Sequence, residues 1–209
     1  MKIIPSLASA NQADLRGELA RLNGIDSLHL DIEDGNFIPN ITFGLRTIRD
    51  VSKLHDMKMD AHLMVTNPYL YIDALAKIGI ASIAAHFECM SYPMEYLRTI
   101  KGLGMKAGIA INPKTITNGL YYYADKLDYV LVMTAEPDTS GQEFQPNMLE
   151  KIAEIRKTFP ETMEIWVDGG IKEHHLADLS KAGANVVIMG RAVFGAENPV
   201  EFIKTLEQL

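Results

Sequence analysis

The sequence contains a single cysteine, Cys89, among its 209 residues. One thiol cannot form a disulfide within the chain, and proteins without disulfides are typical of reducing compartments. No apolar run reaches the roughly 18 residues that a membrane-spanning helix needs. The N-terminus is also unlike a signal peptide, because Pro5 and Ser6 interrupt its apolar start and residues 11–16 are polar. We therefore expect a cytoplasmic protein.

Clusters of positive charge are absent as well. The formal net charge is -7, and the 20 basic and 27 acidic residues are interspersed along the chain. Nucleic acids and anionic membranes bind to concentrated basic residues, so neither is expected as a partner. No linker rich in proline, glycine and serine interrupts the sequence, so residues 1–209 are expected to form one domain.

Short apolar runs alternate with longer segments of helical period along the whole chain. Strands are expected at 2–6, 27–31, 58–64, 82–86, 106–111, 129–133, 164–168 and 185–189, and helices at 11–22, 45–54, 68–78, 94–103, 116–123, 146–158, 172–182 and 199–208. The N-cap expected for the first of these helices is Asn11. Helical crossovers join parallel strands, so eight such units predict a (β/α)8 TIM barrel. A doubly wound open sheet is the alternative, but Pro5-Ser6-Leu7-Ala8 is not a glycine-rich dinucleotide fingerprint.

Reactive side chains gather where the expected strands end, which is where barrels of this kind build their sites. The strand-end residues are Ser6, His29 with Asp31, His62, His86, Asn112, Thr134, Asp168 and Gly190. A lone serine or asparagine at such a position is usually a turn residue, but a whole ring of such groups favours function. For His86 we expect a structural role, as a histidine hydrogen-bonded near its strand end.

A metal site is the first chemistry that these residues suggest. His29 and Asp31 are two residues apart in a strand, so their side chains share one face. Together with His62 and Asp168 they offer imidazole and carboxylate ligands, a mixture that suits Zn, Mn, Fe or Co. The alternative for His29 is a core histidine paired with Asp31.

Proton transfer is the second. Asp31 and Asp168 belong to strands that are well separated around the ring, so their carboxylates could face a bound substrate from opposite sides. Two bases on opposite faces of one carbon are what stereochemical inversion needs, since one removes the proton and the other returns it from behind. Electrostatic stabilisation of an enediolate would assist both steps.

Phosphate binding is the third. Glycine-containing turns follow the seventh and eighth expected strands, at Asp168-Gly169-Gly170 and Met189-Gly190-Arg191. Backbone N–H groups at these two places commonly hold phosphate in barrels. Gly141, in the loop after the sixth strand, is a further candidate donor. The sequence therefore favours a phosphorylated substrate.

Taken together, these stretches resemble the ribulose-phosphate 3-epimerase family over nearly the whole chain. The matching motifs are Pro5-Ser6, His29-Leu30-Asp31, Asp34-Gly35, residues 37–44, His62-Leu63-Met64-Val65, His86 with Glu88, Asn112-Pro113, Met133-Thr134, Gly141-Gln142 with Phe144, residues 167–170 and Gly190. The resemblance implies a TIM barrel of the ribulose-phosphate binding type and epimerisation at C3 of a ketose phosphate.

The resemblance also implies roles for individual residues. One divalent metal would be held by His29, Asp31, His62 and Asp168. Asp31 would accept the proton and Asp168 would donate it. Ser6 would contact the substrate, and we expect His62 to contact the substrate as well. Family members are commonly oligomers, so a homo-oligomer is expected.

Three positions depart from the family pattern. Glu33 stands where methionine is usual, Glu136-Pro137-Asp138-Thr139-Ser140-Gly141 replaces a glycine-rich loop, and Arg191 replaces a serine. An added carboxylate near phosphate is unfavourable, whereas Arg191 could bind phosphate through a charge-assisted pair; a surface salt bridge is its alternative. The chain therefore resembles a divergent branch, acting on ribulose or xylulose 5-phosphate or on a hexulose 6-phosphate.

Two other functions and one interface are alternatives for this sequence. A lyase or synthase of the same barrel class usually places a lysine among the strand-end acids, and none of the strand ends above supplies one. A non-catalytic sugar-phosphate binding paralogue is the second alternative, if Glu33 and the altered loop have abolished turnover. The tyrosines at 121–123 are expected either at an oligomer interface or buried in the barrel wall.

Overall fold

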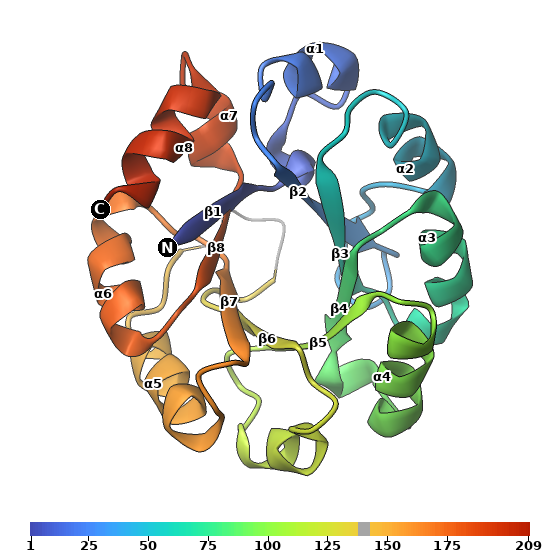
Figure 1. Cartoon of the computed structure of the whole chain (residues 1–209), viewed down its shortest axis with the longest axis vertical. Coiled ribbons are helices and arrows are strands. Elements are labelled where there is room, and N and C mark those ends of the chain that lie inside the picture. The colour runs from blue at the N-terminus through green and yellow to red at the C-terminus, as the bar shows by residue number, and fades with distance from the viewer. Residues whose placement is uncertain (138–142) are drawn as a thin grey trace.

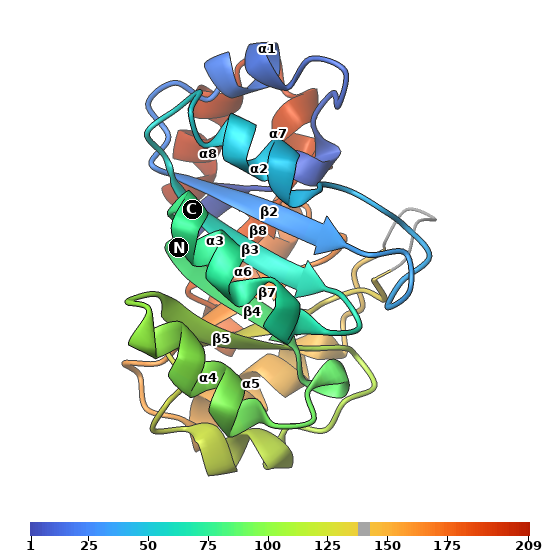
Figure 2. The same cartoon turned by 90° about the vertical axis from the view of Figure 1, so that its right-hand side faces the viewer.

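Eight parallel strands form a ring in the computed structural model, which describes residues 1–137 and 143–209. The strands are β1 (Lys2–Pro5), β2 (Ser27–Glu33), β3 (Lys58–Met64), β4 (Ser82–His86), β5 (Lys106–Ile111), β6 (Tyr129–Met133), β7 (Glu164–Asp168) and β8 (Val186–Met189). Figure 1 looks down this ring, and Figure 2 shows it from the side. The predicted (β/α)8 barrel is confirmed.

Helices surround the ring (Figure 1). The α-helices are α1 (Leu15–Ala20), α2 (Leu45–Val51), α3 (Ile72–Ile78), α4 (Pro93–Gly102), α5 (Met148–Thr158), α6 (Leu176–Ala182), α7 (Arg191–Gly195) and α8 (Pro199–Glu207). Short 3-10 helices are η1 (Leu7–Ser9), η2 (Pro68–Leu70), η3 (Phe87–Cys89), η4 (Asn118–Tyr123) and η5 (Glu173–His175). The expected helix at 116–123 is thus a 3-10 helix.

Hydrogen-bonded pairing runs around the ring in the order β1-β8-β7-β6-β5-β4-β3-β2. Seven Cα pairs join β2 to β3, and in this register His29 lies opposite Asp60 and Asp31 lies opposite His62. The ring closes through a parallel bridge between Ser6 and His29. Because parallel strands place their carboxyl ends at one edge, the strand-end residues meet on one side of the barrel.

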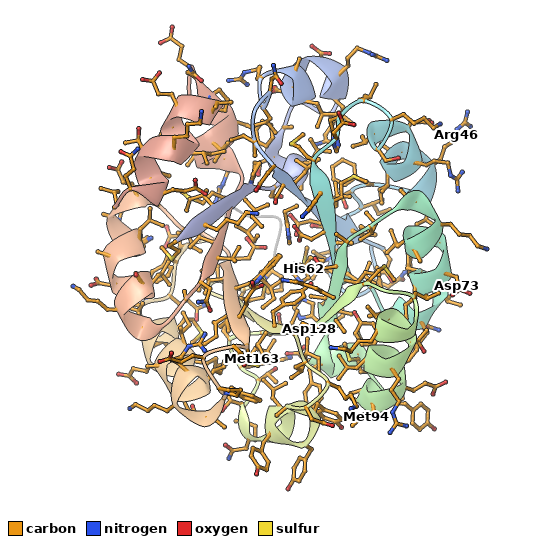
Figure 3. All side chains as sticks on the ribbon, in the orientation of Figure 1. Arg46, His62, Asp73, Met94, Asp128 and Met163 are labelled. Atoms are coloured by element: carbon orange, nitrogen blue, oxygen red, sulfur yellow. The ribbon has the colours of Figure 1, made fainter. Side chains whose placement is uncertain are left out.

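The core has two layers, as expected when strand side chains alternate. The large layer lies between the strands and the helices. The small layer fills the barrel itself, with Ile4, Ala84, Ala110, Tyr129, Leu131, Trp166, Val186 and Ile188. His29, His62 and His86 are buried above it, and Figure 3 shows the labelled His62 near the centre of the ring. The interior is therefore packed, and the three histidines are buried within it.

Local differences from expectation have local causes. The first helix begins three residues later than expected, because Asp14 rather than Asn11 is its N-cap and accepts a 3.0 Å bond from the N–H of Gly17. Asn11 instead accepts from the N–H of Ala13 in a preceding turn. Helix α7 was not predicted. Tyr121 and Tyr122 are 63% and 76% exposed, so burial in the barrel wall is wrong for them.

Among the described residues, no helix has the length and apolar character needed to cross a membrane.

Candidate active site

A cavity of about 860 Å³ opens at the carboxyl ends of the strands. Its volume is within the range of small-molecule sites. The residues that line it include Ser6, Ser9, Asp31, Glu33, Asn40, Met64, Met133, Glu143, Asp168, Gly170, Lys172, Gly190 and Arg191. Residues from both ends of the chain, and from β2, β3, β6 and β7, thus share one chamber.

Four side chains from three strands meet at the floor of this cavity. His29 and Asp31 come from β2, His62 from β3 and Asp168 from β7, and one ligand atom of each lies within 4.8 Å of all the others. Alternation along β2 places His29 and Asp31 on the same face, and the register places His62 beside Asp31. The geometry expected of these four residues is therefore present.

Asp31 is the centre of the cluster. Its Oδ1 lies 3.1 Å from Nε2 of His29 and 3.2 Å from Nδ1 of His62. Its Oδ2 accepts a 2.5 Å hydrogen bond from the hydroxyl of Ser6. Both carboxylate oxygens are thus engaged.

The two aspartates differ sharply in their tendency to ionise. Burial works against the charged form of Asp31, but the charge and hydrogen bond of His29 outweigh it and hold the pKa of Asp31 well below its usual range. Burial, reinforced by the charge of Asp31, raises the pKa of Asp168 to about 7. Near neutral pH one carboxylate is therefore ionised while the other is poised to hold a proton.

Each histidine of the cluster is also hydrogen-bonded at the ring nitrogen that does not face Asp31. Nδ1 of His29 is hydrogen-bonded to Oδ1 of Asp60 on β3, opposite in register. Nε2 of His62 lies 2.9 Å from Nε2 of His86 on β4. Such contacts fix the ring orientation and leave the forward nitrogen of each histidine directed at the cluster.

These residues fit a divalent cation. Two carboxylates and two buried imidazoles converge, and carboxylates packed this closely repel one another unless a proton or a cation lies between them. The mixture of nitrogen and oxygen donors favours Zn, Mn, Fe or Co over Ca or Mg. A site for a divalent metal is therefore plausible from the side chains alone.

Glu33 adds a carboxylate to the cavity wall at the end of β2. Its Oε2 accepts a 2.5 Å hydrogen bond from the side-chain amide of Asn40, in the loop that follows. Burial, with the nearby charge of Asp31, raises the pKa of Glu33 to about 7. A thioether sulfur accepts hydrogen bonds only weakly, so Glu33 gives this cavity a much stronger acceptor than methionine would.

The side of the cavity that follows β7 and β8 carries basic side chains and a closely packed backbone turn. Lys172 and Arg191 line it together with Gly170 and Gly190. A Cβ at position 190 would lie 2.1 Å from Oγ of Ser9, so only glycine lets the first loop pack here. The predicted phosphate side of the barrel is thus polar and cationic.

Some of the expected substrate contacts lie elsewhere. Gly169 has a φ of 112° and packs against Ala135, whose backbone N would be 2.9 Å from a Cβ at that position. Its carbonyl accepts a 2.6 Å bond from Thr134. His62 is fully buried below the cavity. Gly141 and the variant residues Asp138-Thr139-Ser140 lie outside the described residues.

Several residues of the site were not singled out from the sequence. Asp60 lies two residues before His62 on the same strand face, so alternation alone could have found it. His86 was expected to be structural, yet it contacts His62 directly. Lys172, Ser9 and Glu143 carry no motif, and only the folded loops bring them to the cavity.

Comparison with solved structures shows that the fold is widespread. The crystal structure of orotidine 5'-phosphate decarboxylase from Pyrococcus horikoshii OT3 superposes with a TM-score of 0.68 at 18% identity, over 98% of this chain and 96% of that one. At this identity the likeness concerns the barrel fold alone.

Comparison with known sequences is more specific. The chain is 38% identical to the cytoplasmic isoform of ribulose-phosphate 3-epimerase from Oryza sativa subsp. japonica, covering 99% of this chain and 93% of the relative. It is 39% identical to ribulose-phosphate 3-epimerase from Schizosaccharomyces pombe, covering 98% and 92%. The model of the ribulose-phosphate 3 epimerase family matches residues 2–194. The chain therefore belongs to the ribulose-phosphate 3-epimerase family, and the expectation that it is an isomerase, a carbohydrate epimerase, is confirmed.

Proposed function

We propose that this protein inverts C3 of a ketose phosphate by two-base proton transfer through a cis-enediolate and depends on one divalent metal ion. The observation that carries the proposal is the pair Asp31 and Asp168, which enter one cavity from β2 and β7 with opposite tendencies to ionise. Pairs of titratable groups whose pKa values are pushed apart mark acid and base roles.

In the forward reaction the ionised Asp31 removes the proton from C3. The C3–H bond breaks, and its electron pair forms the C2–C3 double bond as negative charge moves to the oxygen on C2. Asp168, in its protonated form, then donates its proton to C3 from the opposite face: the electron pair of the C2–C3 double bond forms the new C3–H bond, and the carbonyl at C2 re-forms. The reaction leaves Asp31 protonated and Asp168 ionised, and the reverse reaction restores both.

The remaining contacts prepare these two groups. The hydrogen bond from Ser6 keeps Asp31 turned toward the cavity, and burial of Asp168 keeps its pKa close to the pH at which it must both give and take a proton. His29, Asp31, His62 and Asp168 would hold the divalent ion. When bound, it supplies positive charge that stabilises the enediolate oxygens.

The substrate class follows from the opposite wall. Lys172, Arg191 and the close-packed turn at Gly190 give an anionic group its partners. The relatives named ribulose-phosphate 3-epimerase support a phosphorylated ketose. Glu33, which faces the same cavity, supports a substrate with a hydroxyl to donate there, and both pentulose and hexulose phosphates have one.

The test is hydrogen exchange in deuterated water. Metal-loaded protein is incubated separately with ribulose 5-phosphate, xylulose 5-phosphate and hexulose 6-phosphates, and deuterium at C3 and the epimer ratio are followed by NMR. We expect one deuterium at C3 and inversion for at least one of them. Binding of a ketose phosphate without exchange would contradict epimerisation and support the non-catalytic paralogue.

Cellular location and assembly remain predictions. The name of the rice relative includes the words cytoplasmic isoform, which supports the same location here. The exposed rings of Tyr121 and Tyr122, 6.1 Å apart, support an interface between copies of this chain.

A further inference from the structure

A chain of hydrogen bonds leads from the cavity floor to the loop after β5. Nδ1 of His62 faces Asp31 at 3.2 Å, and Nε2 of His62 lies 2.9 Å from Nε2 of His86. Nδ1 of His86 lies 3.2 Å from Oε2 of Glu88 in η3. The rings of His62 and His86 are fully buried and nearly parallel, 4.9 Å apart with an interplanar angle of 27°. Water therefore cannot replace any link between the two rings.

At the Glu88 end of these hydrogen bonds, the donor and the acceptor of each contact can be assigned. Oε1 of Glu88 accepts a 2.8 Å bond from the backbone N–H of Asn112 and another from the hydroxyl of Thr115. Burial works against its ionisation, but these donors and the bond from His86 lower the pKa of Glu88 to about 2. An ionised carboxylate only accepts hydrogen bonds. Nδ1 of His86 must therefore carry a proton and donate it to Oε2.

Counting protons along the chain then determines the state of His62. Where His86 is neutral, a proton on its Nδ1 leaves its Nε2 bare, and a bare nitrogen can only accept. The facing Nε2 of His62 must therefore carry the proton of that contact. In neutral His62 this leaves Nδ1 bare, with its lone pair directed at Asp31 and Asp168, whose Oδ2 lies 3.8 Å away. A lone pair between two carboxylates is suited to a cation and not to a hydrogen bond.

We propose that Glu88 and His86 are positioning residues, which fix the tautomer of His62 so that Nδ1 is free to bind the divalent ion. This inference rests on the metal site of the proposed function. His86 and Glu88 would affect metal affinity indirectly, because they determine which nitrogen holds the proton between His62 and His86. Asp60 holds His29 in the corresponding way, but through direct contact.

Glu88→Gln should reverse the direction of the hydrogen bonds from residue 88 through His86 to His62, while the shape of the side chain changes very little. The N–H of Asn112 can only donate, so it requires the oxygen of the new amide, and the amide NH2 group must then face His86. His86 would accept at Nδ1 and donate from Nε2 to His62. His62 would then carry its proton on Nδ1, where it blocks the metal.

Two measurements test this inference. In metal-free protein at about pH 8, long-range 15N–1H spectra of the imidazoles report which nitrogen of His62 is protonated, with the signals assigned from His62→Asn. We expect Nε2–H in wild type and Nδ1–H in Glu88→Gln. Chelator competition should show an affinity for Zn²⁺ or Mn²⁺ about 10–100-fold weaker in Glu88→Gln.

Two control variants separate this role from support of the loop. Glu154→Gln neutralises a carboxylate of α5 that accepts a hydrogen bond from Thr117 in the same loop, and Thr115→Val removes one donor to Glu88 while leaving His86 bonded. Both should retain the wild-type tautomer and metal affinity. Thermal unfolding followed by circular dichroism compares the stability of all variants.

The outcomes are distinct. Nδ1–H of His62 in metal-free wild type overturns the inference even if Glu88→Gln fails to fold. Equal metal affinity in wild type and folded Glu88→Gln also overturns it. Wild type with the expected tautomer but no measurable affinity for Zn²⁺ or Mn²⁺ would support the proton chain and contradict the metal dependence of the proposed function.

Discussion

The carboxylate of Glu33 accepts a 2.5 Å hydrogen bond from the side-chain amide of Asn40 and lines the same cavity as Asp31. An acceptor held in this way can receive a hydroxyl of the substrate. We expect Glu33→Met to lower kcat/KM for the preferred ketose phosphate at least tenfold, since hydrogen bonds to charged groups contribute about 1.5–3 kcal/mol. Steady-state kinetics with pentulose and hexulose phosphates measure this. Glu33→Gln keeps an acceptor and should lose less; an unchanged kcat/KM in Glu33→Met would contradict the role.

Removal of the hydroxyl of Ser6 should slow the chemical step. Ser6→Ala deletes the 2.5 Å bond to Asp31, so the carboxylate loses both orientation and a donor that favours its ionised form. We expect kcat to fall about tenfold or more. Single-turnover deuterium exchange at C3 measures the step. Ser52→Ala, which removes a surface hydroxyl bonded to the carbonyl of Arg49, should leave the rate unchanged.

The cations beside β7 and β8 should act mainly on binding. Lys172→Ala and Arg191→Ala each remove a positive charge from the cavity wall, and we expect KM to rise about tenfold with kcat changed much less. Inhibition by inorganic phosphate should weaken in parallel. Lys53→Ala serves as the control, because Lys53 pairs with Asp50 on the outer surface of α2. A fall in kcat with constant KM would contradict a phosphate role.

Metal removal should affect stability as well as activity. Without a cation, the carboxylates of Asp31 and Asp168 remain close together, so an ion that binds only the folded state should stabilise it by about 2.7 kcal/mol at 100 times its Kd. For a chain of this size we expect the Tm to rise by roughly 5–10 °C on addition of Zn²⁺ or Mn²⁺ to chelator-treated protein. Calorimetry measures the shift, and a Tm unaffected by every metal tried would argue against the site.

Asp34 predicts a pH dependence of stability that does not involve the cavity. Its two oxygens accept from the N–H groups of Asn36 and Phe37 and from both the N–H and hydroxyl of Thr66, which ties the loops after β2 and β3 together. Although its slight burial works against ionisation, these donors lower the pKa of Asp34 to about 2 in the folded state, below about 3.9 in the unfolded state. Its contribution is therefore complete above about pH 4 and is lost as the pH falls toward 2.

We expect Asp34→Asn to lower the free energy of unfolding by about 1–2 kcal/mol at pH 7. The difference from wild type should shrink as the pH is lowered from 5 to 3, because Asp34 of the unfolded wild-type chain takes up a proton in this range while the folded carboxylate stays ionised. Urea unfolding at each pH measures both proteins. Asp56→Asn, an exposed change, provides the control, and a difference that widens in acid would contradict the assignment.

The sequence predicted the barrel and the cluster of His29, Asp31, His62 and Asp168 for a common reason. Alternation along each strand determines which side chains share a face, and the side-chain chemistry at the strand ends is visible in the letters themselves. Both features depend on the order of residues within a single strand, so the sequence alone reveals them. The family motifs then add the substrate class, which the geometry of the cavity alone does not specify.

What the sequence did not predict depends on contacts between distant segments. The link from His62 through His86 to Glu88 requires the register of β3 against β4, and the approach of Lys172 requires the path of the loop after β7. The helix start at Asp14 rather than Asn11 was a competition between two good capping residues, which the local turn decided.

Within the described residues, β1 and β2 are joined by a single bridge between Ser6 and His29, whereas β2 and β3 share seven paired positions. This sparse joint passes directly through the cavity, since Ser6 also binds Asp31 across it. A substrate that contacts residues on both sides of this joint would add to the single bridge, so we expect a bound ligand to hold this part of the barrel wall together more firmly.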